Sequence, residues 1–256
     1  MPTTFFGWVW FLLQKYGMLF LRGTGITMLV VSGTLLGFLL GLLVAIARTV
    51  EPAQGAGKGR RAAVKVLHGI MNVYIQVFRG TPMIVQAMII YYGAMQYLGI
   101  TMNEIAAAVL IVSVNTGAYM AEIIRGGILS IDKGQTEAAH SIGLTHWQTM
   151  TGVVLPQAVR NILPSIGNEF IVNIKDSSVL NVISVSELFF QSKSAAGTYF
   201  RYFEVFFITG CIYLVLTLLV TRAIRLLEKK LEGPDHYVIC GSQSDSASVI
   251  TVTEEK

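Results

Sequence analysis

The residues best suited to chemistry in this chain are charged groups within long apolar segments, and Arg79 is the first of them. Apolar residues flank Arg79 on both sides, so we expect its guanidinium at membrane depth. An unpaired charge there costs at least about 2.5–3.5 kcal/mol. The adjoining Gly80-Thr81-Pro82 predicts a broken helix, in which Thr81 caps a new helix and Pro82 takes its first position. The positive end of that helix and Arg79 would form a pocket for an anion such as a carboxylate.

Acidic side chains could complete a site for a zwitterion. Glu169 and Asp176 are seven residues apart and would share one face of a continuous helix, with Ser178 just beyond it. Carboxylates at this depth could receive an α-ammonium group or a basic side chain. One alternative is that Arg79 pairs permanently with Glu169 as a structural ion pair. Asp176 could pair in the same way with Lys175, and either pair could still open to admit a zwitterion.

Other kinds of chemistry lack the residues that they need. No pair of His or Cys residues has metal-ligand spacing, and no nucleophile–base pair lies in the apolar segments. The chain has no Gly-x-x-x-x-Gly-Lys-Ser/Thr loop for a nucleotide phosphate. We therefore expect no catalytic residues, no metal and no cofactor on this chain.

The apolar segments are typical of a protein that crosses a membrane several times. The chain is 53% hydrophobic and 13% charged, whereas soluble domains are roughly a quarter charged. About 20 apolar residues cross a bilayer. We predict an all-α membrane protein whose five transmembrane helices lie at residues 23–47, 64–97 (interrupted near 79–82), 104–124, 151–174 and 203–227. Gly33, Gly37 and Gly41 recur every four residues, which would let another helix approach the first span closely.

The two ends of the chain differ in character from the membrane domain predicted at 23–230. Residues 1–22, with Trp8 and Trp10, predict an amphipathic helix lying in the membrane surface rather than a sixth span. Residues 231–256 predict a flexible tail. Lys and Arg gather in the loop after the first span, in the loop around 125–133 and after the last span, which predicts an outside N-terminus and a cytoplasmic C-terminus. The net charge of +4 follows from this topology and does not indicate nucleic-acid binding.

A polar stretch at about 131–150 predicts a helical hairpin on the cytoplasmic side. Two helix-capping pairs lie in it: Asp132 with Gln135, and Thr145 with Gln148. Gly143 would end the first short helix, and Pro156 fits near the start of the following span. The alternative is a surface loop that happens to be helical.

This hairpin resembles the EAA motif of ABC importer permeases. The matching elements, at the family's spacing and with valine in place of the usual isoleucine, are Glu137-Ala138-Ala139, Gly143 and Val153-Val154-Leu155-Pro156. The resemblance implies that the hairpin docks on an ATP-hydrolysing subunit and transmits its closure to the membrane helices. The residues that would carry this coupling are Glu137, Ala138, Ala139 and Gly143.

Two further strings resemble signatures of the polar amino-acid branch, which carries histidine, arginine, glutamine, glutamate and related substrates. They are Phe78-Arg79-Gly80-Thr81-Pro82 and Asn173-Ile174-Lys175-Asp176-Ser177-Ser178. The resemblance covers about 23–230 and implies a MetI-like permease fold. The resemblance supports Arg79, Glu169, Asp176 and Ser178 as substrate-binding residues, and we predict that Tyr74 and Thr81 belong to the same site.

The expected function is the transmembrane subunit of a type I ABC importer for polar amino acids in the cell membrane of a prokaryote. The resemblance implies an ATPase dimer that holds ATP and Mg, a second permease copy or paralogue, and an extracytoplasmic solute-binding protein. A passive channel is the alternative, and it predicts flux without nucleotide and a ring of like charges. The sequence leaves open which amino acid is carried, and whether the permease is a homodimer or a heterodimer.

Overall fold

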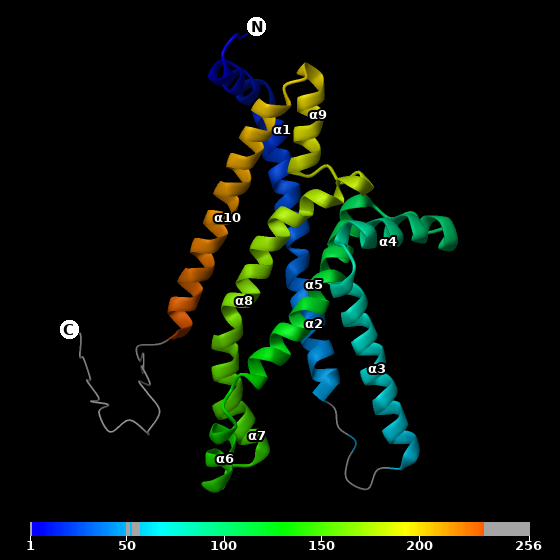
Figure 1. Cartoon of the computed structure of the whole chain (residues 1–256), viewed down its shortest axis with the longest axis vertical. Helices are drawn as coiled ribbons and strands as arrows, with labels where there is room; N and C mark the ends of the chain where they lie inside the picture. Colours follow the sequence, from blue (N-terminus) through cyan, green and yellow to red (C-terminus); the bar gives the residue numbers. More distant parts are fainter. Residues whose placement is uncertain (1, 50–51, 53–56, 233–256) are drawn as a thin grey trace, which may run out of the picture.

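The computed structural model describes residues 2–49, 52 and 57–232. Every element in this described part is a helix (Figure 1). The elements are α1 (Phe5–Val31), α2 (Gly33–Thr49), α3 (Lys58–Gly80), α4 (Met83–Leu98), α5 (Glu104–Leu129), α6 (Lys133–Ser141), α7 (His146–Thr149), the π-helix η1 (Met150–Val154), α8 (Leu155–Asp176), the 3-10 helix η2 (Ser177–Ile183), α9 (Leu188–Tyr199) and α10 (Tyr202–Glu232). The tail predicted at 231–256 lies outside the described residues from 233 onward.

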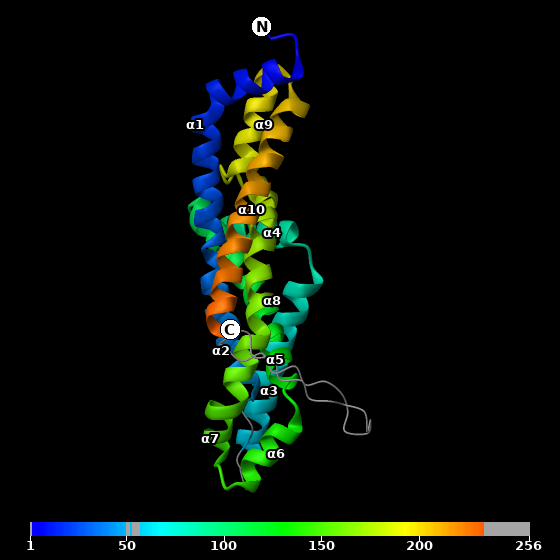
Figure 2. The same cartoon turned by 90° about the vertical axis from the view of Figure 1, so that its left-hand side faces the viewer.

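The first two helices form one nearly continuous rod that bends within its first turns (Figure 2). Only Ser32 separates α1 from α2, and together they make a candidate membrane span of 45 residues, Phe5–Thr49. Figure 2 shows the first turns of α1 crossing the end of the bundle before the helix runs along it. Helix α1 continues through Arg22 and Gly23 into the first predicted span. The place of residues 1–22 in the membrane surface remains a prediction.

The glycine stripe of α2 packs against α5, as its spacing predicts. An ideal Cβ on Gly37 would lie 2.8 Å from the Cβ of Thr116. On Gly41 it would lie 2.5 Å from the Cβ of Met120. Without side chains at these positions the two backbones approach closely, which is how helices gain packing energy in a membrane.

The predicted break in the second span is present. Helix α3 ends at Gly80, α4 begins at Met83, and the two axes bend by 113°. Figure 1 shows α4 running away from the bundle. The role predicted for Thr81 was wrong, because its hydroxyl donates to the carbonyl of Val77 (2.8 Å) and so closes α3 instead of capping α4. Pro82 was predicted at the first position of the new helix, but its backbone is extended and it immediately precedes Met83, the first helical residue of α4.

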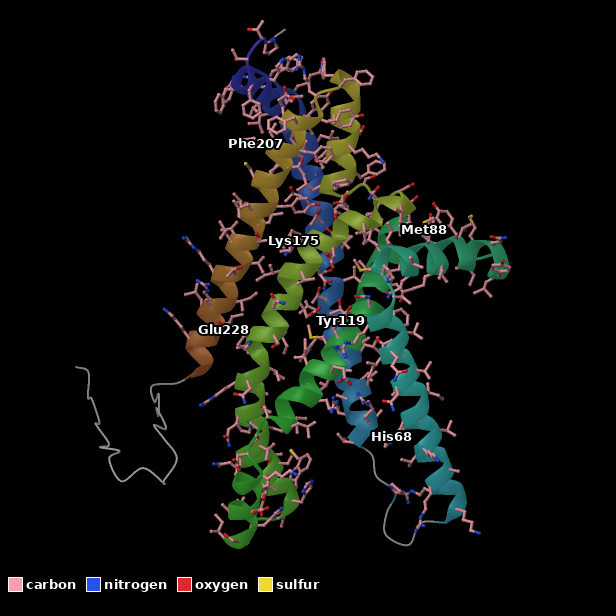
Figure 3. All side chains as sticks on the ribbon, viewed as in Figure 1. His68, Met88, Tyr119, Lys175, Phe207 and Glu228 are labelled. Atoms are coloured by element: carbon pink, nitrogen blue, oxygen red, sulfur yellow. The ribbon has the colours of Figure 1, made fainter. Side chains whose placement is uncertain are left out.

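By length and composition, fewer helices qualify as membrane spans than the five predicted. Within the described residues, three helical segments are long and apolar enough to cross a membrane: Phe5–Thr49, Glu104–Leu129 and Tyr202–Lys230. The broken pair α3–α4 could be a fourth span. The span predicted at 151–174 corresponds to η1 and α8. Helix α8 is about 33 Å long, but it carries Arg160, Glu169 and Lys175 and is too polar to qualify (Figure 3).

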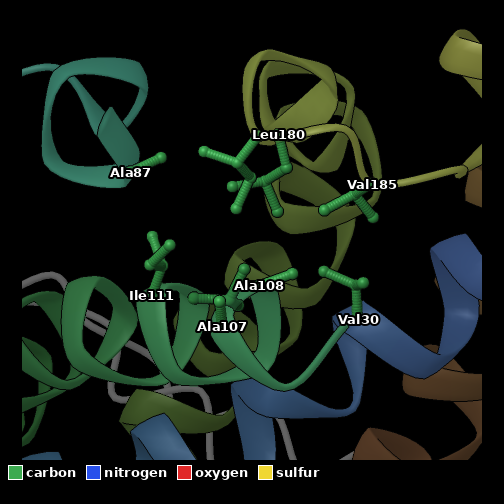
Figure 4. Packing of buried hydrophobic residues seen from close by; sticks show 9 residues of the cluster. Val30, Ala87, Ala107, Ala108, Ile111, Leu180 and Val185 are labelled. Atoms are coloured by element: carbon green, nitrogen blue, oxygen red, sulfur yellow. The ribbon is translucent and has the colours of Figure 1, made fainter. Parts of the chain in front are cut away.

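A buried cluster holds the region around the break together. Val30 of α1, Ile111 of α5 and Leu180 of η2 meet there, with Ala87 of α4 beside them (Figure 4). Asn173 of α8 is buried nearby and donates to two hydroxyls, Thr34 Oγ1 at 2.8 Å and Thr116 Oγ1 at 2.9 Å. These bonds join α8 to α2 and α5, so the end of α8 has a defined position in the bundle.

The helical hairpin forms as predicted, with one difference. Gly143 has φ 86°, in the left-handed region, and it ends α6. Thr145 and Gln148 make the complete reciprocal cap of α7. Asp132 caps α6 through the backbone N–H of Gly134 (2.6 Å), whereas the backbone N–H of Gln135 donates to the Asp132 carbonyl. The hairpin lies at one end of the molecule and leads through η1 into α8.

A buried carboxylate caps α9 at the end of the molecule opposite the hairpin (Figure 1). Glu187 is fully buried and accepts the backbone N–H groups of Phe189 (2.8 Å) and Phe190 (2.7 Å), which caps α9. The hydroxyl of Tyr213 on α10 donates to the same carboxylate at 2.9 Å. Because all of its partners are structural, Glu187 belongs to the scaffold.

Candidate functional site

The break between α3 and α4 is held by two buried amides. Gln86 is only 5% exposed, and its amide nitrogen lies 2.9 Å from the carbonyls of Phe78 and Thr81 and from the Thr81 hydroxyl. Asn115 of α5 donates to the Gln86 carbonyl oxygen at 2.9 Å. The backbone carbonyls that the break leaves without helical partners are therefore satisfied by side chains. Sequence reasoning missed both residues, although each is a polar residue inside an apolar segment.

Gln86→Leu should therefore loosen the break. It removes the Gln86 amide from the Phe78 and Thr81 carbonyls and from Asn115, and leaves Asn115 only its long contact of 3.4 Å with the Phe78 carbonyl. A buried polar group left without a partner costs about 1–3 kcal/mol. Thermal unfolding of the purified complex in detergent should show a clear fall in Tm. The matched control is Gln96→Leu, because Gln96 is exposed on the same helix and its side chain has no hydrogen bond in the described structure. Equal Tm values for the two variants would show that the Gln86 amide does not stabilise the break.

Arg79 lies at the end of α3 with its side chain 44% exposed, facing α5. Its Nη1 is 3.9 Å from Glu122 Oε2, and its guanidinium carbon lies 5.5 Å from the centre of the Tyr119 ring, labelled in Figure 3. Glu122 also holds Arg125 at 2.9 Å and Arg48. The carboxylate beside Arg79 is thus Glu122 of α5. The Arg79–Glu169 ion pair that the sequence left open does not form in the described structure, because the end of α3 packs on α5 and Glu169 projects from α8.

Two carboxylates of α8 have no cation bound to them. Glu169 is half-buried and Asp176 is exposed, and neither forms an ion pair with any residue that the structure describes. The alternative pair between Asp176 and Lys175 is therefore absent as well. Glu169 lies within electrostatic range of both Arg79 and Asp176. A guanidinium and two carboxylates are available around the broken helix.

The other predicted binding residues already have partners within the chain. The Tyr74 hydroxyl donates to the Val114 carbonyl at 2.6 Å, which ties α3 to the middle of α5. Thr81 accepts from Gln86 and donates to α3, as described above. Ser178 is half-buried in η2, and its carbonyl accepts from the Asn181 amide at 2.6 Å. In this conformation these three residues position the break and the end of α8.

The hairpin presents a surface of mixed character. Glu137 and Ala138 are exposed, whereas Ala139 is 4% exposed and packs inside the hairpin. Ala139 also accepts the backbone N–H of Leu144 (3.1 Å), the bond that characterises a helix ended by a left-handed glycine. Two large apolar side chains that sequence reasoning missed are exposed beside them, Ile142 at 78% and Trp147 at 73%. A loop without a partner would not be expected to expose both.

Comparison with known proteins adds a second line of evidence. Residues 37–233 match the family described as "Binding-protein-dependent transport system inner membrane component". The chain is 36% identical to the arginine transport system permease protein ArtQ of Bacillus subtilis (strain 168) over 216 residues, which are 84% of this chain and 93% of that protein. It is 37% identical to the glutamine transport system permease protein GlnP of Escherichia coli (strain K12), with the same coverage.

Solved structures show the same similarity in three dimensions. The chain superposes on a chain of "an amino acid ABC transporter with histidines" with a TM-score of 0.77 and 37% identity, covering 90% of this chain and 100% of that one. It also superposes on a chain of the MetNI methionine ABC transporter with a TM-score of 0.67 and 20% identity, covering 85% and 98% of the two chains. At that lower identity the likeness supports the fold.

Proposed function

Because this chain belongs to the family of binding-protein-dependent transport system inner membrane components and is a permease subunit of an amino-acid ABC importer, we propose that Arg79, Glu169 and Asp176 bind the transported amino acid. The observation that carries the proposal is a guanidinium at a broken helix together with two carboxylates of α8 that have no ion-pair partner among the described residues, of which Glu169 interacts electrostatically with Arg79. Arg79 suits the substrate carboxylate, and the two acids suit its α-ammonium group. Tyr74, Thr81 and Ser178 would line the rest of this binding site.

The class of substrate follows from the same charges. Two carboxylates and one guanidinium balance a zwitterion and leave one negative charge for a basic side chain or for a hydrogen-bonded amide. Relatives named for arginine and glutamine transport, and a solved relative with histidines, support a polar amino acid.

The topology that we propose has five spans. They are formed by α1–α2, the broken pair α3–α4, α5, α8 and α10. Helix α8 can cross the bilayer despite its charges if its polar face lines a hydrated path, which is where ionisable residues of membrane helices are found. The basic residues beside the hairpin and after Thr221 support a cytoplasmic position for both segments and an N-terminus outside.

The family implies an ATPase partner and a substrate-binding protein. We propose that ATP and Mg bind to the ATPase and that the hairpin docks on it, with Glu137 and Ala138 in contact and Ala139 and Gly143 shaping the turn. Ile142 and Trp147 would become buried on docking. A second permease copy or a paralogue completes the pathway, since one chain supplies only one wall of it.

Uptake into vesicles tests this function. Labelled arginine, glutamine and histidine are offered with the substrate-binding protein to vesicles that contain the purified complex, with and without internal ATP. We expect uptake of at least one of them only with ATP. Uptake that does not need ATP would support the passive channel instead.

Glu137→Lys is expected to abolish ATP-driven uptake and to weaken capture of the ATPase by the permease. A reversed charge at a docked and partly desolvated position costs several kcal/mol. Gln135→Lys is the matched control, because Gln135 is exposed on the opposite face of α6 and the substitution adds the same cation. The docking role fails if the two variants copurify with the ATPase equally well and transport equally fast.

A further inference from the structure

Helix α3 has three distinct faces. One packs on the bundle through Ile75, with Met71 and Tyr74 beside it. The second is apolar and exposed, and it consists of Val66, Ile70, Val73 and Val77. The third is a row of polar residues three or four positions apart, exposed except for the half-buried His68 (Figure 3): Lys58, Arg61, Lys65, His68, Asn72, Gln76 and Arg79. We call this row the polar face of α3.

The upper part of the polar face lies at the depth of the membrane core. Tyr74 bonds to Val114, and Asn115 reaches the Phe78 carbonyl at 3.4 Å, so this part of α3 lies beside the middle of α5. Helix α5 is apolar enough to span a bilayer. Asn72 and Gln76 belong to the same turns of α3 as Tyr74 and Phe78. Their amides are therefore level with the hydrocarbon.

Those amides have no hydrogen-bond partner among the residues that the structure describes, and both are exposed. Hydrocarbon cannot supply such partners, so polar groups at this depth face water or protein. The neighbouring valines of α3 can face lipid at no cost. The polar face continues to the cations at the start of α3 and is exposed except at His68, whose Nε2 is buried. Water is therefore the partner that fits its exposed groups.

We propose that the polar face of α3 lines a hydrated path along which the substrate carboxylate leaves Arg79 for the cytoplasm. The inference rests on the proposed function, since Arg79 is the starting point of the path. Gln76 and Asn72 offer amide donors to the carboxylate one and two turns below Arg79. Lys65, Arg61 and Lys58 then make the cytoplasmic mouth positive, which raises the local concentration of anionic groups there.

Residues 72 and 73 are adjacent in sequence, as are 76 and 77, but they point to different faces of α3. The first of each pair belongs to the polar face and the second to the apolar one. Neighbouring positions should therefore differ sharply in their contact with water.

Cysteine labelling measures that contact. Single cysteines are placed by Asn72→Cys, Val73→Cys, Gln76→Cys and Val77→Cys in a chain that also carries Cys211→Ser and Cys240→Ser. The intact complex in vesicles is treated with an anionic and with a cationic methanethiosulfonate reagent, both impermeant, and each rate is divided by the rate with a free thiol. Because reaction requires a hydrated thiolate, we expect labelling at 72 and 76 to be at least about 10-fold faster than at 73 and 77. The positive mouth should favour the anionic reagent.

Labelling that is equal at adjacent positions, or faster at 73 and 77, would overturn the inference. If a cysteine at 72 or 76 prevents assembly, Lys65→Cys and Val66→Cys give the same comparison further along the polar face. The two proposals fail separately: slow labelling at the polar face removes the path alone, and ATP-independent uptake by the chain with no introduced cysteine removes the proposed function.

Discussion

Gly41→Val is expected to prevent the permease from folding into a stable bundle. A side chain at Gly41 would start 2.5 Å from the Met120 Cβ and 2.9 Å from two backbone atoms of α5, Ala121 N and Gly117 O. Backbone cannot move aside as a flexible side chain can, so α2 and α5 would have to separate. Overpacking in a core costs about 1–3 kcal/mol, and a clash with backbone in the most extensive helix pair of the molecule should exceed that range. Size-exclusion profiles and Tm of the detergent-purified chain measure the loss.

The control for this prediction is Gly25→Val. Gly25 belongs to the same long rod, and a Cβ there meets nothing within 4 Å. The two substitutions have the same helix propensity and the same added volume, so any difference between them reports the contact with α5. Comparable yield and Tm for both variants would show that the α2–α5 approach is not as tight as the glycine stripe indicates.

Arg79→Ala is expected to lower the potency with which the amino acid stimulates ATP hydrolysis by about 100-fold or more. Each hydrogen bond to a charged group contributes about 1.5–3 kcal/mol, and a guanidinium can make two with one carboxylate. Assembly should be intact, because the Arg79–Glu122 contact is long at 3.9 Å and Glu122 keeps Arg48 and Arg125. Titration of ATPase activity with each amino acid, in the complex with the substrate-binding protein, gives the shift.

Arg79→Lys separates charge from geometry. Lysine keeps the positive charge but cannot hold a carboxylate with two parallel hydrogen bonds. We therefore expect the potency of the amino acid with Arg79→Lys to lie between its potency with the wild-type chain and with Arg79→Ala. If transport by Arg79→Ala proceeds at normal affinity, the carboxylate assignment is wrong. The position of Arg79 beside Glu122 would then be that of a structural ion pair.

Glu122 gives the Arg79 site a further property. Its carboxylate lies 3.9 Å from Arg79, so the substrate carboxylate that we propose for Arg79 would have to compete with it. Glu122 is shared among Arg48, Arg79 and Arg125, and Arg79 is the most distant of the three. The long contact leaves the Arg79 guanidinium accessible, as its 44% exposure also indicates. Arg79 is thus neutralised enough to be tolerated at this depth and remains available to a ligand.

Local chemistry made several features of the fold predictable. Gly80-Thr81-Pro82 broke the second span where expected, because proline and glycine act on the backbone of their own neighbourhood. Gly143 and the Thr145–Gln148 cap formed for the same reason, since both partners lie within four residues. The long EAA spacing predicted the family, and the family match over 37–233 confirmed it.

The sequence by itself thus determined the break, the hairpin and the glycine stripe, because each depends on residues a few positions apart on one helix or turn. Only the tertiary structure decided that Glu122 is the carboxylate beside Arg79, that Gln86 and Asn115 clamp the break, and that Asn173 ties α8 to two helices. The physical reason is distance along the chain. Asn173 and Thr34 are 139 residues apart, so no periodicity within one helix could reveal that they meet.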